Sequence, residues 1–329
     1  MKKLLAILLV LVVATSAFAG GRRQAADTGL IKIGIVNLHP AESGYRAANV
    51  AEMARVFNRE TGFDVRSANV NTLAEQLAAA NQFITDGVQY LLICPADMNG
   101  WQPTLAAARR AGIPVFVFDR AMNVPPEYFT AFIGSDMHRQ GQRAVDWLER
   151  QNRPGGYRFI HINGQMGSAA QVGRATPLLE AVQRHANWTI VREGTGGDTW
   201  SADEARRIVE AAIAAGENFN VIYAHNDGMA RGAMTALQAA GISHGVNGDV
   251  WIMGFDFNRF ALRYILSGDW NFNGQMSPFQ AEVIYGFIRD MEAGRPLNLP
   301  ANRMVILDEQ IADRNNISQA FIDRYGLGD

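Results

Sequence analysis

The sequence contains almost no cysteine, since Cys94 is the only one in 329 residues. No intramolecular disulfide can therefore form, even in an oxidising compartment, and the fold has to depend on its hydrophobic core. An excess of positive charge is also missing, because the formal net charge is −2 at pH 7. This excludes the basic surface of a nucleic-acid-binding protein, so we expect neutral molecules or other proteins as partners and no nucleic acid.

Motifs for catalysis are missing as well. Residues 37–44, which follow the first expected strand, contain no Gly-x-Gly-x-x-Gly pattern, and no P-loop occurs elsewhere in the sequence. The six histidines show no paired metal-ligand spacing. We therefore expect a protein that binds without catalysing a reaction, with no cofactor and no metal. An exported α/β enzyme acting on sugars is the weakest alternative.

Only one long apolar run is present, and it lies at the N-terminus. Lys2 and Lys3 precede the apolar residues 4–13, and Ala17-Phe18-Ala19 fits a small-x-small cleavage site. The run is shorter than the roughly 20 residues that span a bilayer. We expect a signal peptide, residues 1–19, cleaved near Ala19, and a periplasmic mature protein. The alternatives are an uncleaved anchor or a buried core helix.

The rest of the chain alternates strand-like apolar runs with helical patterns, which predicts an α/β fold with parallel sheets. Arg153-Pro154-Gly155-Gly156 breaks a long helix, after which the pattern starts again. We expect two similar doubly wound lobes joined by a hinge, with the ligand cleft between them. The predicted N-terminal lobe comprises residues 30–138 plus about 270–303, and the C-terminal lobe comprises 139–269 plus about 304–329. The expected strands are 31–36, 63–67, 90–94, 115–118 and 132–134, then 158–162, 189–193, 221–224 and 251–254.

Polar residues follow three of these expected strands directly. Asp119 and Arg120 end one, Asn226 follows another, and Asp256 follows a third. Ligands gather at the carboxyl ends of strands in open α/β sheets. A carboxylate accepts from two neighbouring hydroxyls and an arginine donates a planar fork, so such residues suit a hydroxyl-rich ligand. The alternatives are a plain ion pair or turn at Asp119, and a helix cap at Asp227.

Other candidate ligand-binding residues lie at helix starts and at the end of a short strand-like run. Tyr45 and Arg46 combine an aromatic face with a cation, a combination that suits a sugar. Trp200 begins a helix, as does Trp101, and the alternative for either ring is packing in the hydrophobic core. For Arg174 and Gln275, each taken alone, a position on the surface is the more common alternative to ligand binding.

These residues resemble the periplasmic sugar-binding proteins of bacterial ABC importers with the ribose-binding-like (type I) fold, and within them the galactofuranose-binding branch. The resemblance extends over about residues 31–322. It rests on motifs in the same order and spacing, namely Glu42-Ser43-Gly44-Tyr45-Arg46, Gly100-Trp101 with Pro103, Ile113-Pro114-Val115-Phe116 followed by Asp119-Arg120, and Tyr223-Ala224-His225-Asn226-Asp227. The family has a tryptophan where this chain has Tyr45. Ribose binders carry an asparagine where Cys94 stands, so ribose is not the expected ligand.

The resemblance implies a receptor that closes by a hinge over a monosaccharide, of the galactofuranose or galactose-like class or a related pentose. It also implies delivery to a membrane permease of an ABC importer, and we expect a monomer. The alternative is an accessory protein that presents a sugar or signal molecule to a chemoreceptor or sensor kinase. The predicted ligand-binding residues are Glu42, Tyr45, Arg46, Asp119, Arg120, Arg174, Trp200, Asn226, Asp256 and Gln275.

Overall fold

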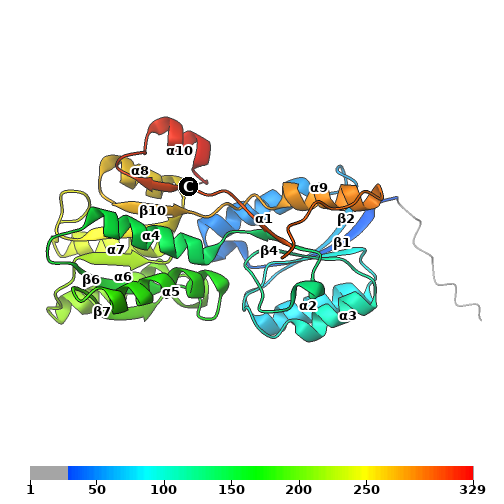
Figure 1. Cartoon of the computed structure of the whole chain (residues 1–329), viewed down its shortest axis with the longest axis horizontal. Helices are drawn as coiled ribbons and strands as arrows, with labels where there is room; N and C mark the ends of the chain where they lie inside the picture. Colours follow the sequence, from blue (N-terminus) through cyan, green and yellow to red (C-terminus); the bar gives the residue numbers. More distant parts are fainter. Residues whose placement is uncertain (1–28, 329) are drawn as a thin grey trace, which may run out of the picture.

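Two open α/β sheets of six strands each form the centres of two lobes (Figure 1). The computed structural model describes residues 29–328, so the predicted signal peptide, 1–19, lies outside the described residues. The α/β class and the two doubly wound lobes predicted from the sequence are confirmed. Within residues 29–328, no helix combines the length and the hydropathy that crossing a bilayer requires.

The first sheet is entirely parallel, with strand order β11-β5-β4-β3-β1-β2. Its side chains alternate between the two faces, as a two-residue period requires. Ile33 and Ile35 of β1 pack in the cluster that contains α1 and α9, while Val36 packs with α2 and α3. Accordingly these helix pairs cover opposite faces in Figure 1. The strands are β1 (Ile31–Asn37), β2 (Phe63–Asn69), β3 (Tyr90–Ile93), β4 (Val115–Asp119), β5 (Ala131–Gly134) and β11 (Met304–Ile306), and the helices are α1 (Gly44–Val56), α2 (Leu73–Thr85), α3 (Gln102–Arg110) and α9 (Ala281–Glu292).

The second sheet repeats this topology with strand order β12-β10-β9-β8-β6-β7. Only the edge strand β12, paired with β10, is antiparallel. The repetition makes β4 and β9 equivalent strands of the two lobes. The strands are β6 (Tyr157–Asn163), β7 (Trp188–Thr195), β8 (Val221–Ala224), β9 (Trp251–Asp256), β10 (Phe272–Gln275) and β12 (Ile311–Asp313), and the helices are α4 (Met137–Gln151), α5 (Ala169–Arg184), α6 (Ala202–Ala214), α7 (Asp227–Ala239), α8 (Arg259–Ser267) and α10 (Gln319–Tyr325). Short 3-10 helices lie at η1 (Pro40–Glu42), η2 (Pro126–Tyr128) and η3 (Gly197–Thr199).

The chain passes between the sheets three times, after β5, after β10 and after β11. Sheet membership at the last two crossings differs from the predicted boundaries at about 270 and 304. Strand β10 lies beside β9, with Gln275 opposite Asp256, so residues 272–275 belong to the second sheet. Strand β11 extends the first sheet by pairing with β5, Met304 opposite Phe132. These strands have four and three residues, too few for hydrophobic alternation to indicate which sheet they join.

One buried carboxylate connects the three crossing segments. Glu309, in the third crossing, accepts hydrogen bonds from the Ser135 hydroxyl of the first and from the Ser277 backbone N–H of the second, at 2.8 Å for Ser277. Its other oxygen accepts from Gln140 Nε2 at 2.9 Å. Burial raises the pKa of Glu309. The carboxylate therefore fixes the relative positions of the three segments about which the lobes would move.

Candidate functional site

A small cavity lies between the two lobes, at the carboxyl ends of the sheet strands, where an open α/β fold places its ligands. Its free volume is about 10 Å³, enough for about one water molecule. The structure is therefore a closed form in which the lining side chains nearly fill the site. The lining consists of Glu42, Ser43, Tyr45 and Arg120 from the first lobe, Ala170, Arg174, Trp200, Asn226 and Asp256 from the second, and Met276 from a crossing segment.

Seven of the ten predicted residues line this cavity: Glu42, Tyr45, Arg120, Arg174, Trp200, Asn226 and Asp256. Arg46, Asp119 and Gln275 do not. Ser43, Ala170 and Met276 line it but are absent from the predicted set. Ser43 lies within the motif that begins at Glu42, so that motif contained a signal for it. Ala170 and Met276 carry no polar group, and nothing in the sequence marks them.

The two aspartates at the ends of the equivalent strands β4 and β9 have strained backbones. Asp119 has φ 64° and Asp256 has φ 116°, in the region that favours glycine. Each such residue costs about 1–3 kcal/mol, and this strain persists only where the surroundings impose it. A positive φ at equivalent positions of both lobes shows that the surrounding structure imposes the local backbone at each strand end.

Asp119 lies directly behind the cavity wall and is fully buried. Tyr45 Oη donates to its Oδ1 at 2.8 Å, and Cys94 Sγ and the Arg46 guanidinium donate to its Oδ2, at 3.1 Å for the thiol. Burial acts to raise the pKa of Asp119, but the guanidinium groups of Arg46 and Arg120 outweigh it and the pKa is lowered. The carboxylate is thus ionised and fully engaged by the protein, and Tyr45 stands between it and the cavity. Burial raises the pKa of Cys94, which remains a thiol.

Glu42 joins the two arginines of the first lobe. Its Oε2 accepts from Arg46 Nε at 3.0 Å and its Oε1 from Arg120 Nη2 at 2.8 Å. Arg120 also reaches the second lobe, because its Nη1 donates to Gln165 Oε1 at 2.9 Å and its guanidinium lies 5.4 Å from the ring centre of Trp200. Arg120 therefore contributes both to the cavity wall and to the contact between the closed lobes.

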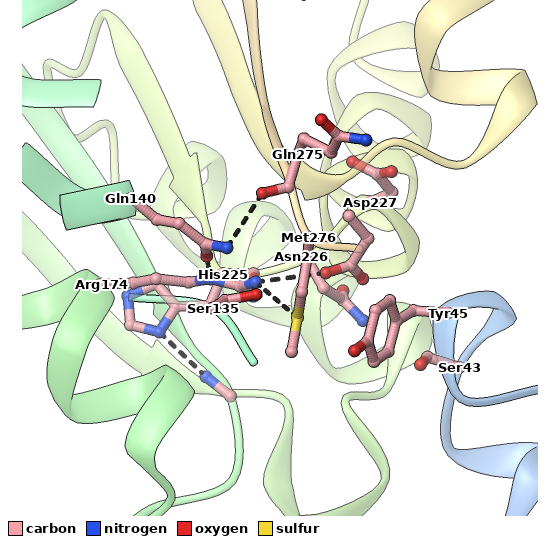
Figure 2. A network of polar contacts seen from close by, with 12 residues as sticks. Ser43, Tyr45, Ser135, Gln140, Arg174, His225, Asn226, Asp227, Gln275 and Met276 are labelled. Atoms are coloured by element: carbon pink, nitrogen blue, oxygen red, sulfur yellow. Dashed lines mark hydrogen bonds and ion pairs between the residues drawn. The ribbon is translucent and has the colours of Figure 1, made fainter. Parts of the chain in front are cut away.

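Arg174 occupies the corresponding central place in the second lobe. Its guanidinium donates to Asp256 Oδ1 at 3.3 Å, to Gln140 Oε1 at 3.1 Å and to the His225 carbonyl, and it contacts the Met276 sulfur at 3.1 Å (Figure 2). Burial raises the pKa of Asp256 to about 7, although Arg174 opposes this shift. Asp256 thus faces the cavity as a carboxyl group that holds its proton more tightly than an exposed aspartate does.

Asn226, rather than Asp227, caps helix α7. Its Oδ1 accepts from the Met229 backbone N–H at 2.8 Å, which leaves its side-chain NH₂ as the group that a ligand can use. Asp227 is the first residue of the helix and is fully buried, where it accepts from Asn258 and Asn273. The alternative of a helix cap at Asp227 is therefore wrong, since Asn226 is the cap, and Asp227 stabilises the loop after β9.

Met276, rather than the predicted Gln275, lines the cavity. The Gln275 Oε1 accepts from the Gln310 backbone N–H at 2.8 Å, and its carbonyl accepts from Gln140 Nε2 at 2.9 Å. In Figure 2 the Gln275 amide points away from Arg174, whereas the Met276 sulfur points toward it. Gln275 therefore supports the crossing segment, and the neighbouring Met276 lines the cavity.

The two tryptophans considered from the sequence have different roles. Trp101 is fully buried in the first lobe's core, and its Nε1 donates to the Asp97 carbonyl at 3.0 Å. Trp200 lines the cavity, and its buried Nε1 has no hydrogen-bond partner among the described residues. The same holds for Arg120 Nε. Buried polar groups are normally hydrogen-bonded, so two unpartnered donors at one cavity indicate positions for acceptor atoms of a ligand.

The charged groups of the site are matched in number, although Asp256, with a pKa of about 7, is only partly ionised at neutral pH. Three guanidinium groups, of Arg46, Arg120 and Arg174, lie against three carboxyl groups, of Glu42, Asp119 and Asp256. A net charge on the ligand would leave one of these buried charges uncompensated, which is costly. The lining therefore suits a neutral molecule with hydroxyl groups, for which the lobes have to separate beyond the volume of about 10 Å³ found here. Within residues 29–328 no cluster of three or more His, Cys, Asp or Glu side chains is arranged to hold a metal ion.

Comparisons with known proteins agree with this description. Residues 23–294 match the family model described as periplasmic binding protein domain. The galactofuranose-binding protein YtfQ of Escherichia coli is 29% identical over 247 residues, which cover 73% of this chain and 76% of YtfQ. The fructose import binding protein FruE of Bifidobacterium longum is 28% identical over 288 residues, 85% of this chain and 84% of FruE. The arabinose-transporter binding protein of Shewanella sp. ANA-3, solved with α- and β-L-arabinofuranose, superimposes with a TM-score of 0.79 at 25% identity, covering 89% of this chain and 95% of that one.

Proposed function

This chain belongs to the periplasmic binding protein domain family, and we propose that its lobes close over one neutral monosaccharide of the galactofuranose or galactose-like class or a related pentose. It is a periplasmic sugar-binding protein of the ABC-transporter type, and its relatives are solute-binding proteins rather than enzymes. It therefore acts by binding. The sugar class is proposed because the relatives named above carry galactofuranose, fructose and arabinofuranose in their names.

The observation that supports this proposal best is the pair of unpartnered donors, Arg120 Nε and Trp200 Nε1, one from each lobe. A hydroxyl oxygen can accept from each donor while its hydrogen is donated to a carboxylate such as Asp256. Because the donors come from different lobes, a sugar that satisfies both favours the closed form over the open one. In this proposal Glu42, Tyr45, Arg120, Arg174, Asn226 and Asp256 surround the sugar, and Arg46 and Asp119 position Tyr45 and Glu42 from behind.

A thermal-shift screen of the purified protein, refolded to remove bound sugar, tests this function. The panel contains galactose, arabinose, ribose, glucose, xylose and fructose. A ligand at about 100 times its dissociation constant adds roughly 2.7 kcal/mol of stability, which gives a visible rise in melting temperature. We expect a rise with galactose or arabinose. No rise with any sugar would contradict the proposal.

A pair of tryptophan variants then locates the site. Trp200→Phe removes a donor that has no partner in the free protein, so we expect a roughly tenfold loss of sugar affinity, with a melting temperature lowered only by the smaller volume of the buried ring. Trp101→Phe is the matched control, because its Nε1 already donates to a backbone carbonyl. That change should lower the melting temperature and leave the affinity unchanged. The reverse pattern would place the sugar elsewhere.

We also propose that the protein is exported after cleavage near Ala19 and delivers its sugar to an ABC permease. Mass spectrometry of the protein recovered from the periplasm reports the cleavage directly. Uptake of the bound sugar should be lost when either the gene of this protein or the permease gene is deleted. Uptake that needs the permease but not this protein would instead favour the sensing role.

A further inference from the structure

We propose that the sugar site extends outward into a second subsite that takes a further neutral sugar ring, so that the protein binds a disaccharide or another glycoside. This inference rests on the proposed function and concerns the size of its ligand. The second subsite is the outer cavity, which lies next to the closed inner cavity described above. It is lined by Ala41, Glu42, Ser43, Gly44, Thr199, Trp200, Ser201, Ala202, Asn226, Gly228, Arg231, Asn258 and Phe260.

The inner and outer cavities share part of their walls. Glu42, Ser43, Trp200 and Asn226 line both of them. The outer cavity has a volume of about 390 Å³, against about 10 Å³ for the inner one. Pockets for small molecules typically measure about 300–1,000 Å³. The closed protein therefore has its free space outside the inner cavity, in a place that a substituent on the inner sugar would reach.

An aromatic ring and a free cation form one wall of the outer cavity. The Arg231 guanidinium lies 4.2 Å from the ring centre of Phe260. Arg231 is exposed, and its side chain has no hydrogen-bond or ion-pair partner in the described part of the chain. A half-buried phenyl ring offers a face for the C–H groups of a sugar, while the unpaired guanidinium can donate to its oxygens.

The remaining polar groups favour hydroxyls over an anionic substituent. Asn258 Oδ1 is a buried acceptor without a partner among the described residues. A sugar hydroxyl can donate to it, whereas a deprotonated phosphate or carboxylate has no hydrogen to donate. Arg231 is exposed, so solvent screens its charge and it needs no anionic partner. The polar side chains of Ser43, Thr199 and Ser201 also make a purely apolar substituent a poor match.

Calorimetric titration of the full protein tests the second subsite. Any monosaccharide that binds in the panel is compared with its methyl glycoside and with a disaccharide that carries it as a terminal unit, such as lactose for galactose, sucrose for fructose or xylobiose for xylose. We expect the disaccharide to bind at least as tightly as the methyl glycoside. Arg231→Ala should weaken the disaccharide roughly tenfold and leave the monosaccharide unchanged. Arg110→Ala, at an exposed arginine in the last turn of α3, is the matched control and should change neither.

The outcomes separate this inference from the proposed function. Binding of monosaccharides with exclusion of every disaccharide would overturn the second subsite and leave the proposed function intact. The same holds if Arg231→Ala weakens monosaccharide and disaccharide equally or affects neither. If no sugar of either size binds, the proposed function fails and the second subsite fails with it.

Discussion

Replacing Gly44 by alanine should weaken sugar binding while leaving the fold as stable as before, or slightly more stable. Gly44 is the first residue of α1 in the first lobe, and it faces Asn258 of the second lobe. A Cβ atom at this position would lie 2.3 Å from Asn258 Oδ1 and 3.3 Å from its Cγ. Ordinary contacts between such atoms are roughly 3.5–4.0 Å, so the closed form would contain a severe overlap.

Asn258 cannot simply rotate away. Its backbone N–H and its Nδ2 both donate to the buried carboxyl group of Asp227, at 2.8 and 3.1 Å. Breaking the side-chain hydrogen bond would leave a buried polar group without a partner, which costs about 1–3 kcal/mol. Since the closed form is the one that holds the sugar from both lobes, we expect the dissociation constant to rise about 10- to 100-fold. In the open form no clash exists, and alanine in place of glycine in a helix gains up to about 1 kcal/mol.

Titration calorimetry and thermal unfolding of the same samples measure the two effects. Gly286→Ala is the matched control, since Gly286 lies in α9 and a Cβ there meets no atom within 4 Å. It should raise the stability of its helix without changing the affinity. Adding Asn258→Ala to Gly44→Ala removes the clashing atoms and should restore part of the affinity. If Gly44→Ala binds sugar like the unmodified protein, the cleft does not close as described, and the reasoning is refuted.

Two further predictions concern buried carboxyl groups. The pKa of Asp256 is raised from 3.8 to about 7, so the folded state binds the carboxyl proton more tightly than the unfolded chain does. The stability that this proton contributes is complete below about pH 4 and is lost as the pH rises through 7. The melting temperature of Asp256→Asn relative to the unmodified protein should therefore increase between pH 4 and pH 8, and a difference that does not vary with pH would contradict this. Glu309→Gln loses one acceptor among the three crossing segments and should cost about 1–3 kcal/mol, seen as a lower melting temperature. Glu127→Gln, at an exposed position in η2, is the control, and equal melting temperatures for the two variants would count against the role of Glu309.

The fold class, and the edge of each sheet where the candidate site lies, can be predicted from the order of the amino acids alone. Strand-like runs alternating with helical patterns indicate parallel sheets, and the carboxyl ends of parallel strands meet at one edge. Residues placed immediately after such strands, including Arg120, Asn226 and Asp256, could therefore be expected to converge. They do line one cavity.

The tertiary structure decided which of those side chains face the cavity. Asp119 follows its strand as the pattern requires, yet Tyr45, Arg46 and Cys94 engage both of its oxygens and remove it from the wall. No local pattern reveals this, because the partners lie 25 to 74 residues away along the chain.

Contacts between residues far apart in the sequence also determine the crossing segments and the outer cavity. Gln275 and Met276 are neighbours, and the Gln275 side chain accepts a hydrogen bond from Gln310, 35 residues away along the chain. Strands of three or four residues join a sheet through pairing with distant strands rather than through their own periodicity. Phe260 and Arg231 come from different helices, so their contact at the cleft exists only once the second lobe has folded.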